Sequence, residues 1–349
     1  MAGGSTLFHC KRNNKFEEMK QHSDNTYTPN WLDRHHLGFF NLVLYALLPH
    51  SKQDRRELEL CRPLHAGEIN PHWPRPWLYL RALALFIIAL ALLYTCWTIE
   101  QRYESSNLLP GLAIVGSLIV PITLMIFFWE INKWRSLTLL DILKYFLVGS
   151  SLSIAITFVL HYFLDFMPDK KFFYDNRHYF TPRLMMDYGP IPLVITALVE
   201  ESAKAFTILV ILLSKRKKYH ILHGILVGAA VGAGFAVFES AGYIIMYQKS
   251  LLAIIIERSL TASSCHVAWG ALMGGAIAKA FDGKSYLRLM VHPVVYAAFF
   301  LVCSLHFVWN YLIDTTSRLN RSIELGVVTW FMLLLMIWLG LREIARERE

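Results

Sequence analysis

Ionisable side chains interrupt four long apolar segments of this chain, where such residues are normally avoided. They are Glu200, Glu201 and Lys204 in the first segment, Glu239 in the second, His266 in the third, and His306 in the fourth, which also carries the polar Asn310. A charge at the centre of a bilayer costs about 2.5–3.5 kcal/mol on insertion scales, so residues of this kind usually face a protein interior. Carboxylates and imidazoles enclosed together can transfer protons, stabilise an oxyanion or bind a metal ion. The sequence therefore predicts a polar site inside a membrane protein.

The composition agrees with a membrane protein. The 349 residues are 55% hydrophobic and only 17% charged, whereas a soluble domain carries about a quarter charged residues. The apolar residues fall in blocks long enough to cross roughly 30 Å of hydrocarbon at about 20 residues each. We predict an all-α polytopic membrane helix bundle of about eight transmembrane helices, near residues 78–98, 108–129, 143–165, 191–214, 221–247, 259–281, 290–313 and 324–341.

The positive charge of the chain indicates orientation in a membrane. The formal net charge is +8, and the Lys and Arg residues concentrate in short loops between apolar blocks. Such loops encode topology, and they argue against nucleic acid as a partner. The basic cluster SKRKK at 214–218 is expected on the cytoplasmic side, and alternation then places both termini there as well. We expect a multi-pass protein of the cell (inner) membrane, in contact with lipid; the oligomeric state stays open.

The chain divides into five regions by composition. They are an N-terminal cytoplasmic or interfacial region (1–76), three accessory transmembrane helices (77–170), an extracytoplasmic loop (171–190), a four-helix catalytic core (191–313), and a last transmembrane helix with a basic cytoplasmic tail (314–349). An apolar run near residues 37–48 is too short to span a bilayer, so we expect an interfacial helix or a small soluble core there.

The polar residues of the 191–313 core are expected at one depth. In the alternating topology, most of them lie roughly 10–15 Å below the outer face, at a rise of about 1.5 Å per residue. Gly224, Gly228 and Gly232 form a stripe that lets helices approach closely. Glu239 follows Gly232 by seven residues and shares its face. We therefore expect a single site in the outer half of the membrane.

The residue types predict individual roles. Glu200 and Lys204 are spaced i, i+4 and can pair along their own helix. Glu201 points about 100° away and has no predicted partner in its helix, so it is available as a base. His266 and His306 can donate hydrogen bonds to an oxyanion, or they can bind a metal ion as neutral imidazoles.

Four motifs in order resemble those of the PrsW family of intramembrane proteases, which is similar to the type II CAAX prenyl-proteases and the bacteriocin-processing enzymes. The motifs are EESAK at 200–204, GFAVFES at 234–240, His266 within HVAWGALMG, and HFVWN at 306–310. Phe235 and Glu239 give the form FxxxE, and Arg258 precedes His266 by eight residues, where PrsW-like sequences tend to carry an arginine. The resemblance covers about residues 190–313. It implies cleavage of membrane-anchored protein substrates, such as anti-sigma factors or other regulatory proteins.

The predicted catalytic residues are Glu200, Glu201, Glu239, His266, His306 and Asn310, with Lys204, Phe235 and Arg258 in support. We expect Glu201 to act as general base on water, with Glu200 or Glu239 assisting. The two histidines and Asn310 would stabilise the tetrahedral oxyanion.

Two further questions stay open in the sequence. No cofactor is expected, because paired carboxylates can share a proton and activate water without a metal. The alternative is a Zn²⁺ ion bound by Glu201, Glu239, His266 and His306. In other functional classes, the same residues would serve a proton- or ion-coupled transporter as a relay, or a non-catalytic peptide-binding or immunity protein.

Overall fold

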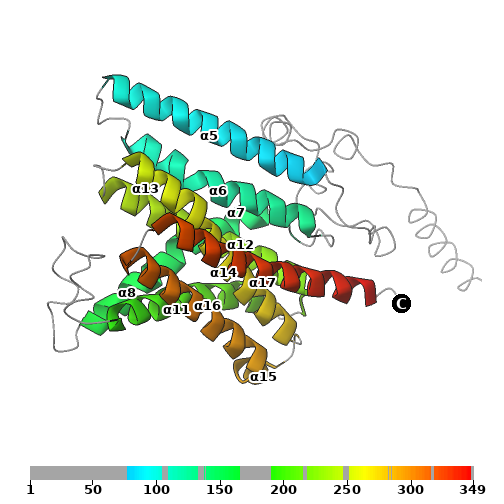
Figure 1. The fold of residues 1–349 in the computed structure, drawn as a ribbon. Coiled ribbons are helices and arrows are strands. Elements are labelled where there is room, and N and C mark those ends of the chain that lie inside the picture. Colours follow the sequence, from blue (N-terminus) through cyan, green and yellow to red (C-terminus); the bar gives the residue numbers. More distant parts are fainter. Residues whose placement is uncertain are drawn as a thin grey trace, which may run out of the picture. The chain divides into compact units, whose positions relative to one another are not determined.

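The computed structural model describes residues 77–346, with gaps at 104–108, 133–136, 138, 166–189, 215–217, 247–250, 282, 284 and 316–317. Every secondary-structure element in the described residues is helical, which confirms the all-α prediction (Figure 1). The predictions for residues 1–76, including the apolar run near 37–48, lie outside the described residues, as does almost all of the 171–190 loop. The division into five regions stays a prediction.

The helices follow the predicted apolar blocks closely. Their bounds are α5 (Trp77–Tyr103), α6 (Leu109–Ile131), α7 (Leu139–Val148), η2 (Gly149–Ser153), α8 (Ile154–Asp165), α11 (Ile191–Leu213), α12 (Ile221–Met246), α13 (Leu251–Glu257), η4 (Arg258–Ala262), α14 (Ser263–Ala280), α15 (Tyr286–Met290), α16 (Pro293–Thr315) and α17 (Arg318–Arg346). The two η elements are π-helical turns between α-helices. The segment predicted at 259–281 begins earlier than expected, because α13 and η4 lead into α14.

The predicted count of about eight spanning helices is not confirmed. Six spans in the described residues are long and apolar enough to cross a membrane: Ala82–Ile99, Leu109–Trp129, Leu140–Leu164, Ile221–Ile245, Pro293–Tyr311 and Ile323–Glu343. The helices α11 and α14 are not among them. α11 carries three charged residues in its middle, and α14 is rich in small residues and carries a histidine and a lysine. The residues that build the site are the ones that lower the apolar character of these two helices.

The centre of the bundle is a close crossing of α12 and α14. A methyl group added to Gly224, Gly228 or Gly232 would collide with the backbone of α14, at the carbonyl oxygens of Gly274, Gly270 and His266 respectively. The packing role predicted for the glycine stripe is therefore confirmed. Such close backbone approach is typical of membrane helices, where small residues replace bulky ones at interfaces.

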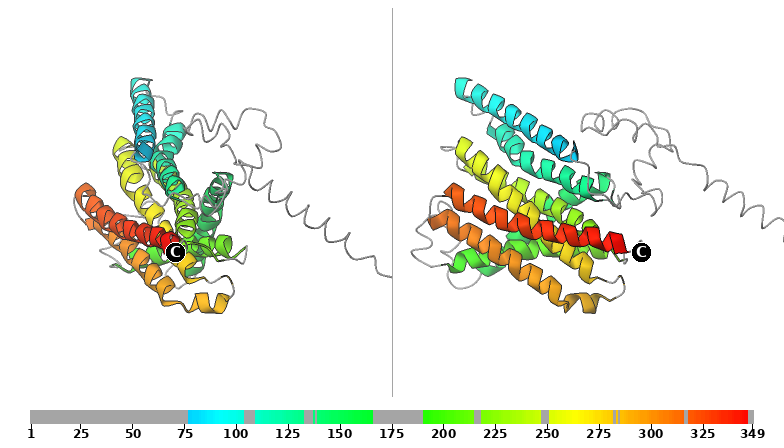
Figure 2. Two further views of the ribbon diagram at one scale, coloured as in Figure 1. Left: turned by 90° about the vertical axis from the view of Figure 1, so that its right-hand side faces the viewer. Right: turned by 45° about the vertical axis from the view of Figure 1, so that its right-hand side comes forward.

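Other contacts fix α12 from its remaining sides. Gly234 of α12 faces the backbone of Phe146 and Ser150, at the junction of α7 and η2. At the beginning of α12, Glu343 of α17 accepts a hydrogen bond from the backbone N–H of Ile221 at 2.8 Å, which satisfies one of the donors left free at a helix start. The long helices between α5 and α17 run alongside one another in both views of Figure 2. The result is a fixed central helix that crosses α14 at Gly224, Gly228 and Gly232 and carries Glu239 in its second half.

Candidate active site

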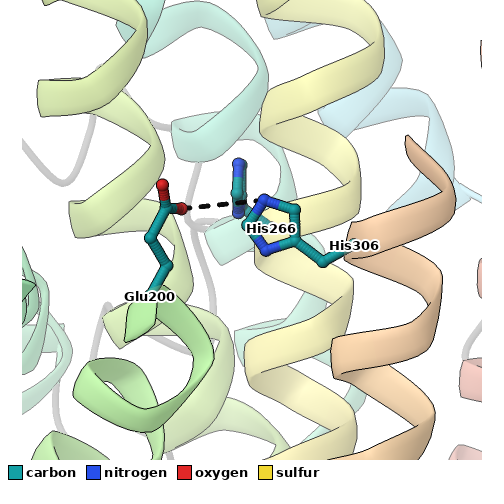
Figure 3. A group of neighbouring side chains, drawn as sticks. All are labelled: Glu200, His266 and His306. Atoms are coloured by element: carbon teal, nitrogen blue, oxygen red, sulfur yellow. Dashed lines mark ion pairs between the residues drawn. The ribbon is translucent and has the colours of Figure 1, made fainter. Parts of the chain in front are cut away.

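The predicted site residues lie where α11, α12, α14 and α16 meet. α11 begins after Pro190 with Pro192 in its first turn, a favourable start for a helix because proline has no N–H to leave unpaired. Figure 3 shows Glu200 of α11, His266 of α14 and His306 of α16 pointing toward one another. Three helices that are distant in sequence thus contribute one polar cluster.

Glu201 connects α11 to α16. Lys204 Nζ donates a hydrogen bond to Glu201 Oε1 at 2.5 Å, and His306 Nδ1 lies 2.8 Å from the same oxygen. A carboxylate oxygen only accepts, so Nδ1 of His306 carries the hydrogen and donates it. In the neutral ring the other nitrogen of His306, Nε2, is then free of hydrogen, and it lies 3.7 Å from Glu200 Oε2.

His266 is held between a lysine and a carboxylate. Its Nδ1 lies 2.9 Å from Lys204 Nζ, and its Nε2 lies 2.9 Å from Glu239 Oε2. An ammonium group has no acceptor, so Nδ1 accepts from Lys204 and Nε2 carries the hydrogen that faces Glu239. Arg258 Nη2 lies 2.7 Å from Glu239 Oε1, and the Arg258 guanidinium lies over the ring of Tyr243 at 4.1 Å. A continuous polar network therefore runs from Arg258 to His306.

Two predicted pairings are wrong. The spacing predicts that Lys204 can pair with Glu200, and it predicts no partner for Glu201 in its own helix. The structure pairs Lys204 with Glu201 at 2.5 Å instead. Residues at i+3 and i+4 are both neighbours on a helix surface, and the position of His266 draws the lysine toward the side of Glu201.

Three residues form a group that can hold a metal ion. One possible ligand atom from each of Glu200, His266 and His306 lies within 4.8 Å of the other two, and all three residues are buried. Two histidines and one glutamate are a ligand set that catalytic zinc sites use. The predicted metal set differs, because Glu201 and Glu239 lie outside this group and Glu200 takes their place.

The charges of the cluster fit a cation at this place. Lys204 pairs with Glu201, and Arg258 pairs with Glu239. Glu200 makes no ion pair with lysine or arginine among the residues that the structure describes, and its buried Oε2 has no hydrogen-bond partner there. Burying a polar atom without a partner is costly. A divalent cation bound by Glu200 and the histidines would remove that cost, so the donor set fits a metal ion.

Of the remaining predicted residues, Phe235 contacts the cluster directly, and Asn310 lies on the helix that carries His306. Asn310 is buried one turn beyond His306, and its Nδ2 donor finds no partner in the described part of the chain. The ring of Phe235 packs against His266, with centroids 5.5 Å apart, and faces the ammonium of Lys204 at 4.4 Å.

Two aromatic residues of the site were not predicted from the sequence. The ring of Trp269 stacks on His306 at 4.8 Å between centroids and meets His266 edge-on at 5.0 Å. Tyr243 lies under Arg258. Each follows a predicted site residue by three or four positions, Trp269 after His266 and Tyr243 after Glu239, so helical spacing was the available signal.

These observations define a helical membrane protein with a buried carboxylate–histidine site. Residues 139–339 match the family described as "PrsW family intramembrane metalloprotease", and the chain belongs to this family. It is also 25% identical over 224 residues to "Protease PrsW" of Clostridioides difficile (strain 630), covering 63% of this chain and 82% of that relative. No solved structure matches the chain.

Family membership confirms the predicted resemblance and assigns an activity. The protein is an intramembrane protease, an endopeptidase that hydrolyses peptide bonds in a membrane context. This assignment favours the protease over the transporter and the non-catalytic binding protein. The description of the family as metalloproteases also agrees with the three-residue group that can hold a metal ion.

Proposed function

We propose that this protease cleaves membrane-anchored proteins with the help of a zinc ion held by Glu200, His266 and His306. The observation that supports the metal ion most directly is the approach of three ligand atoms, from three separate helices, to within 4.8 Å of one another. The sequence favoured a metal-free mechanism with a glutamate-activated water. The geometry of the cluster and the description of the family both favour the zinc alternative.

A bound zinc ion would supply Lewis acidity for hydrolysis of the peptide bond. The protein residues around it would supply orientation. Glu201 accepts the Nδ1 hydrogen of His306 and so leaves Nε2 directed toward Glu200. A carboxylate that fixes the ring of a metal-binding histidine in this way also increases its basicity. Trp269 stacks against the same ring.

The general base is better assigned to Glu239 than to Glu201. Glu201 Oε1 already accepts from both Lys204 and His306, and this side chain is only 2% exposed. The side chain of Glu239 is 15% exposed and lies beside His266. We assign Glu239 Oε2 the role of taking a proton from the attacking water, and Glu201 the role of positioning His306.

Asn310 would stabilise the oxyanion of the tetrahedral intermediate. Its buried Nδ2 has no partner in the described part of the chain and lies one turn from His306. An unpaired donor held in a dry site can act on developing negative charge without reorganisation. The role predicted for Asn310 from the sequence is therefore retained in the proposal.

The proposed substrates are single-pass membrane proteins of a regulatory kind, cleaved near the outer face of the cell membrane. Support comes from the position of the site, since Glu239 and its partner Arg258 lie toward the Met246 end of α12, and the basic cluster at 214–218 precedes the other end of this helix in the sequence. Both termini would then be cytoplasmic.

Co-expression with single-pass membrane proteins, tagged at both ends, tests the proposed function. We expect one or more of them to be cut into two tagged fragments by the wild-type chain and to stay intact with the Glu200→Gln variant. Glu324→Gln, a substitution of an exposed carboxylate on α17, is the matched control and should cleave normally. Equal cleavage by wild type and Glu200→Gln would contradict the assignment of Glu200 to the site.

A further inference from the structure

A buried lysine lies directly beside the proposed metal ligands. Lys204 is 1% exposed, and its Nζ lies 2.5 Å from Glu201 Oε1 and 2.9 Å from His266 Nδ1. The ring of Phe235 covers the ammonium at 4.4 Å, and the ring of Trp269 lies 5.7 Å from it. A charge so deeply enclosed needs partners on all sides, and two polar groups and two aromatic faces provide them.

The contact between Lys204 and His266 is incompatible with metal binding through either ring nitrogen. Nδ1 uses its lone pair to accept from Lys204. A metal bound at Nδ1 would need that same lone pair. A metal bound at Nε2 would instead require a neutral ring with its hydrogen on Nδ1, where it would oppose the N–H groups of the lysine. Whichever nitrogen binds the metal, the Lys204–His266 contact has to open.

The contact between Lys204 and Glu201 has no such conflict. Glu201 lies outside the three-residue metal group, and its Oε1 can keep both Lys204 and His306 as donors when a metal is bound. The lysine therefore has a position to retain after it leaves His266, on the same turn of α11.

The charge balance of the cluster decides whether Lys204 favours or opposes the binding of a metal ion. Without a metal, Lys204 and Arg258 neutralise Glu201 and Glu239, and Glu200 is the carboxylate in excess. A divalent cation then makes the positive charges exceed the carboxylates by one. Lys204 thus stabilises the empty site and opposes the incoming ion.

We propose that Lys204 supplies the positive charge of the metal site while no metal ion is bound. It holds Glu201 and His266 together before a metal ion arrives, and it releases His266 but keeps Glu201 when the ion binds. The proposal rests on the zinc site of the proposed function. It makes Lys204 a positioning residue of the empty site, with an effect on metal affinity opposite to that of a ligand.

Zinc binding to full-length protein purified in detergent tests the proposal. The wild type, Lys204→Met and Lys204→Gln would be stripped of metal, and the Kd for zinc measured by competition with a chromogenic chelator. Both variants should melt at a lower temperature than wild type without metal, and both should bind zinc about tenfold more tightly, because a like charge beside the ligands is gone. His266 should keep its orientation, since Phe235 and Trp269 still pack against its ring.

Two control variants separate charge from packing. Lys204→Arg keeps the charge and should not gain zinc affinity, and Lys279→Met removes an exposed lysine of α14 and should change neither quantity. If Lys204→Met does not accumulate as folded protein, Lys204→Gln, which can still donate to Glu201, decides the outcome.

The outcomes distinguish this proposal from the function on which it rests. Unchanged or weaker zinc binding in the Lys204→Gln variant, with zinc bound normally by the wild type, would overturn the role of Lys204 alone. Absence of zinc binding in the wild type would overturn the metal site itself, and with it the exchange proposed for Lys204.

Discussion

α12 and α17 are both long apolar helices, but they occupy opposite kinds of surroundings. In the membrane-length apolar span of α12, 94% of the residues are buried, against 22% in that of α17 and 11% in that of α5. α12 packs through glycines and carries Glu239, whereas α17 exposes large side chains such as Phe331 and Val327. Similar mean hydropathy therefore does not distinguish the helix that builds the site from the helices that face outward.

The difference follows from what drives packing in a bilayer. Lipid is as apolar as leucine, so membrane helices gain little by burying large apolar side chains against each other. Close backbone approach and polar contacts hold the interior instead. Small residues and paired charges should therefore tolerate substitution poorly in α12, and large apolar residues should tolerate it well in α17.

The largest effect is expected at the crossing of α12 and α14. In the Gly228→Ala variant the added methyl group would meet the carbonyl oxygen of Gly270, which belongs to the backbone and cannot rotate away. We expect a loss of about 1–3 kcal/mol or more, typical of overpacking, seen as reduced monodisperse protein on size exclusion and a lower melting temperature. Gly242→Ala, on the same helix, is the matched control, since an added Cβ there meets nothing within 4 Å. A similar loss in both variants would remove the distinction.

The next largest effect is expected at Glu201, which positions the metal ligand His306 and is not a ligand itself. Glu201→Gln should weaken zinc binding and slow cleavage by roughly 10–100-fold, the range for groups that orient metal ligands. Folded yield should fall as well, because Lys204 would lose its ion-pair partner. Complete loss of zinc, equal to that in Glu200→Gln, would instead make Glu201 a ligand.

A smaller effect is expected at the more exposed end of the network. Arg258→Gln removes the partner of Glu239, but these two side chains are 13% and 15% exposed, so solvent screens the loss in part. We expect cleavage to slow by about tenfold, and Arg258→Lys to restore most of the rate because it keeps the charge. Failure of lysine to restore any activity would show that Arg258 acts through geometry rather than charge.

The smallest effect is expected on the outward face of α17. Phe331 is 61% exposed, and Phe331→Leu should change stability by no more than about 0.5 kcal/mol. Trp269→Leu is the buried comparison, and it should lower zinc affinity because the stack on His306 is lost. Thermal melting and zinc titration of both variants check this contrast. Equal behaviour would mean that burial does not separate the two regions.

The sequence was sufficient to predict the helices and the family. Long apolar blocks with few interruptions make spanning segments readable, and the spacing of Gly224, Gly228 and Gly232 indicated the close crossing that the structure has. The same patterns did not separate α11 and α14 from the helices that meet the criterion for a membrane span. Their polar and small residues serve the site, at the expense of apolar character.

The partners of individual side chains could not be predicted. Lys204 can reach both Glu200 and Glu201 along α11, and only the position of His266 on another helix decides between them. The π-helical turn η4, which begins at Arg258, gave no visible signal in the sequence. A π turn inserts a residue into a helix and changes which way the flanking side chains face, so spacing from Arg258 to His266 could not give their relative direction.

The metal content of the purified protein tests the central claim most directly. Elemental analysis of full-length protein in detergent should find one zinc ion per chain in the wild type and in Asn310→Ala. It should find none in Glu200→Gln, His266→Ala and His306→Ala, and chelation should stop cleavage by the wild type. The zinc site would be contradicted if the wild-type protein held no stoichiometric zinc and cleaved equally well after chelation. The metal-free mechanism, with a glutamate-activated water, would then be the favoured one.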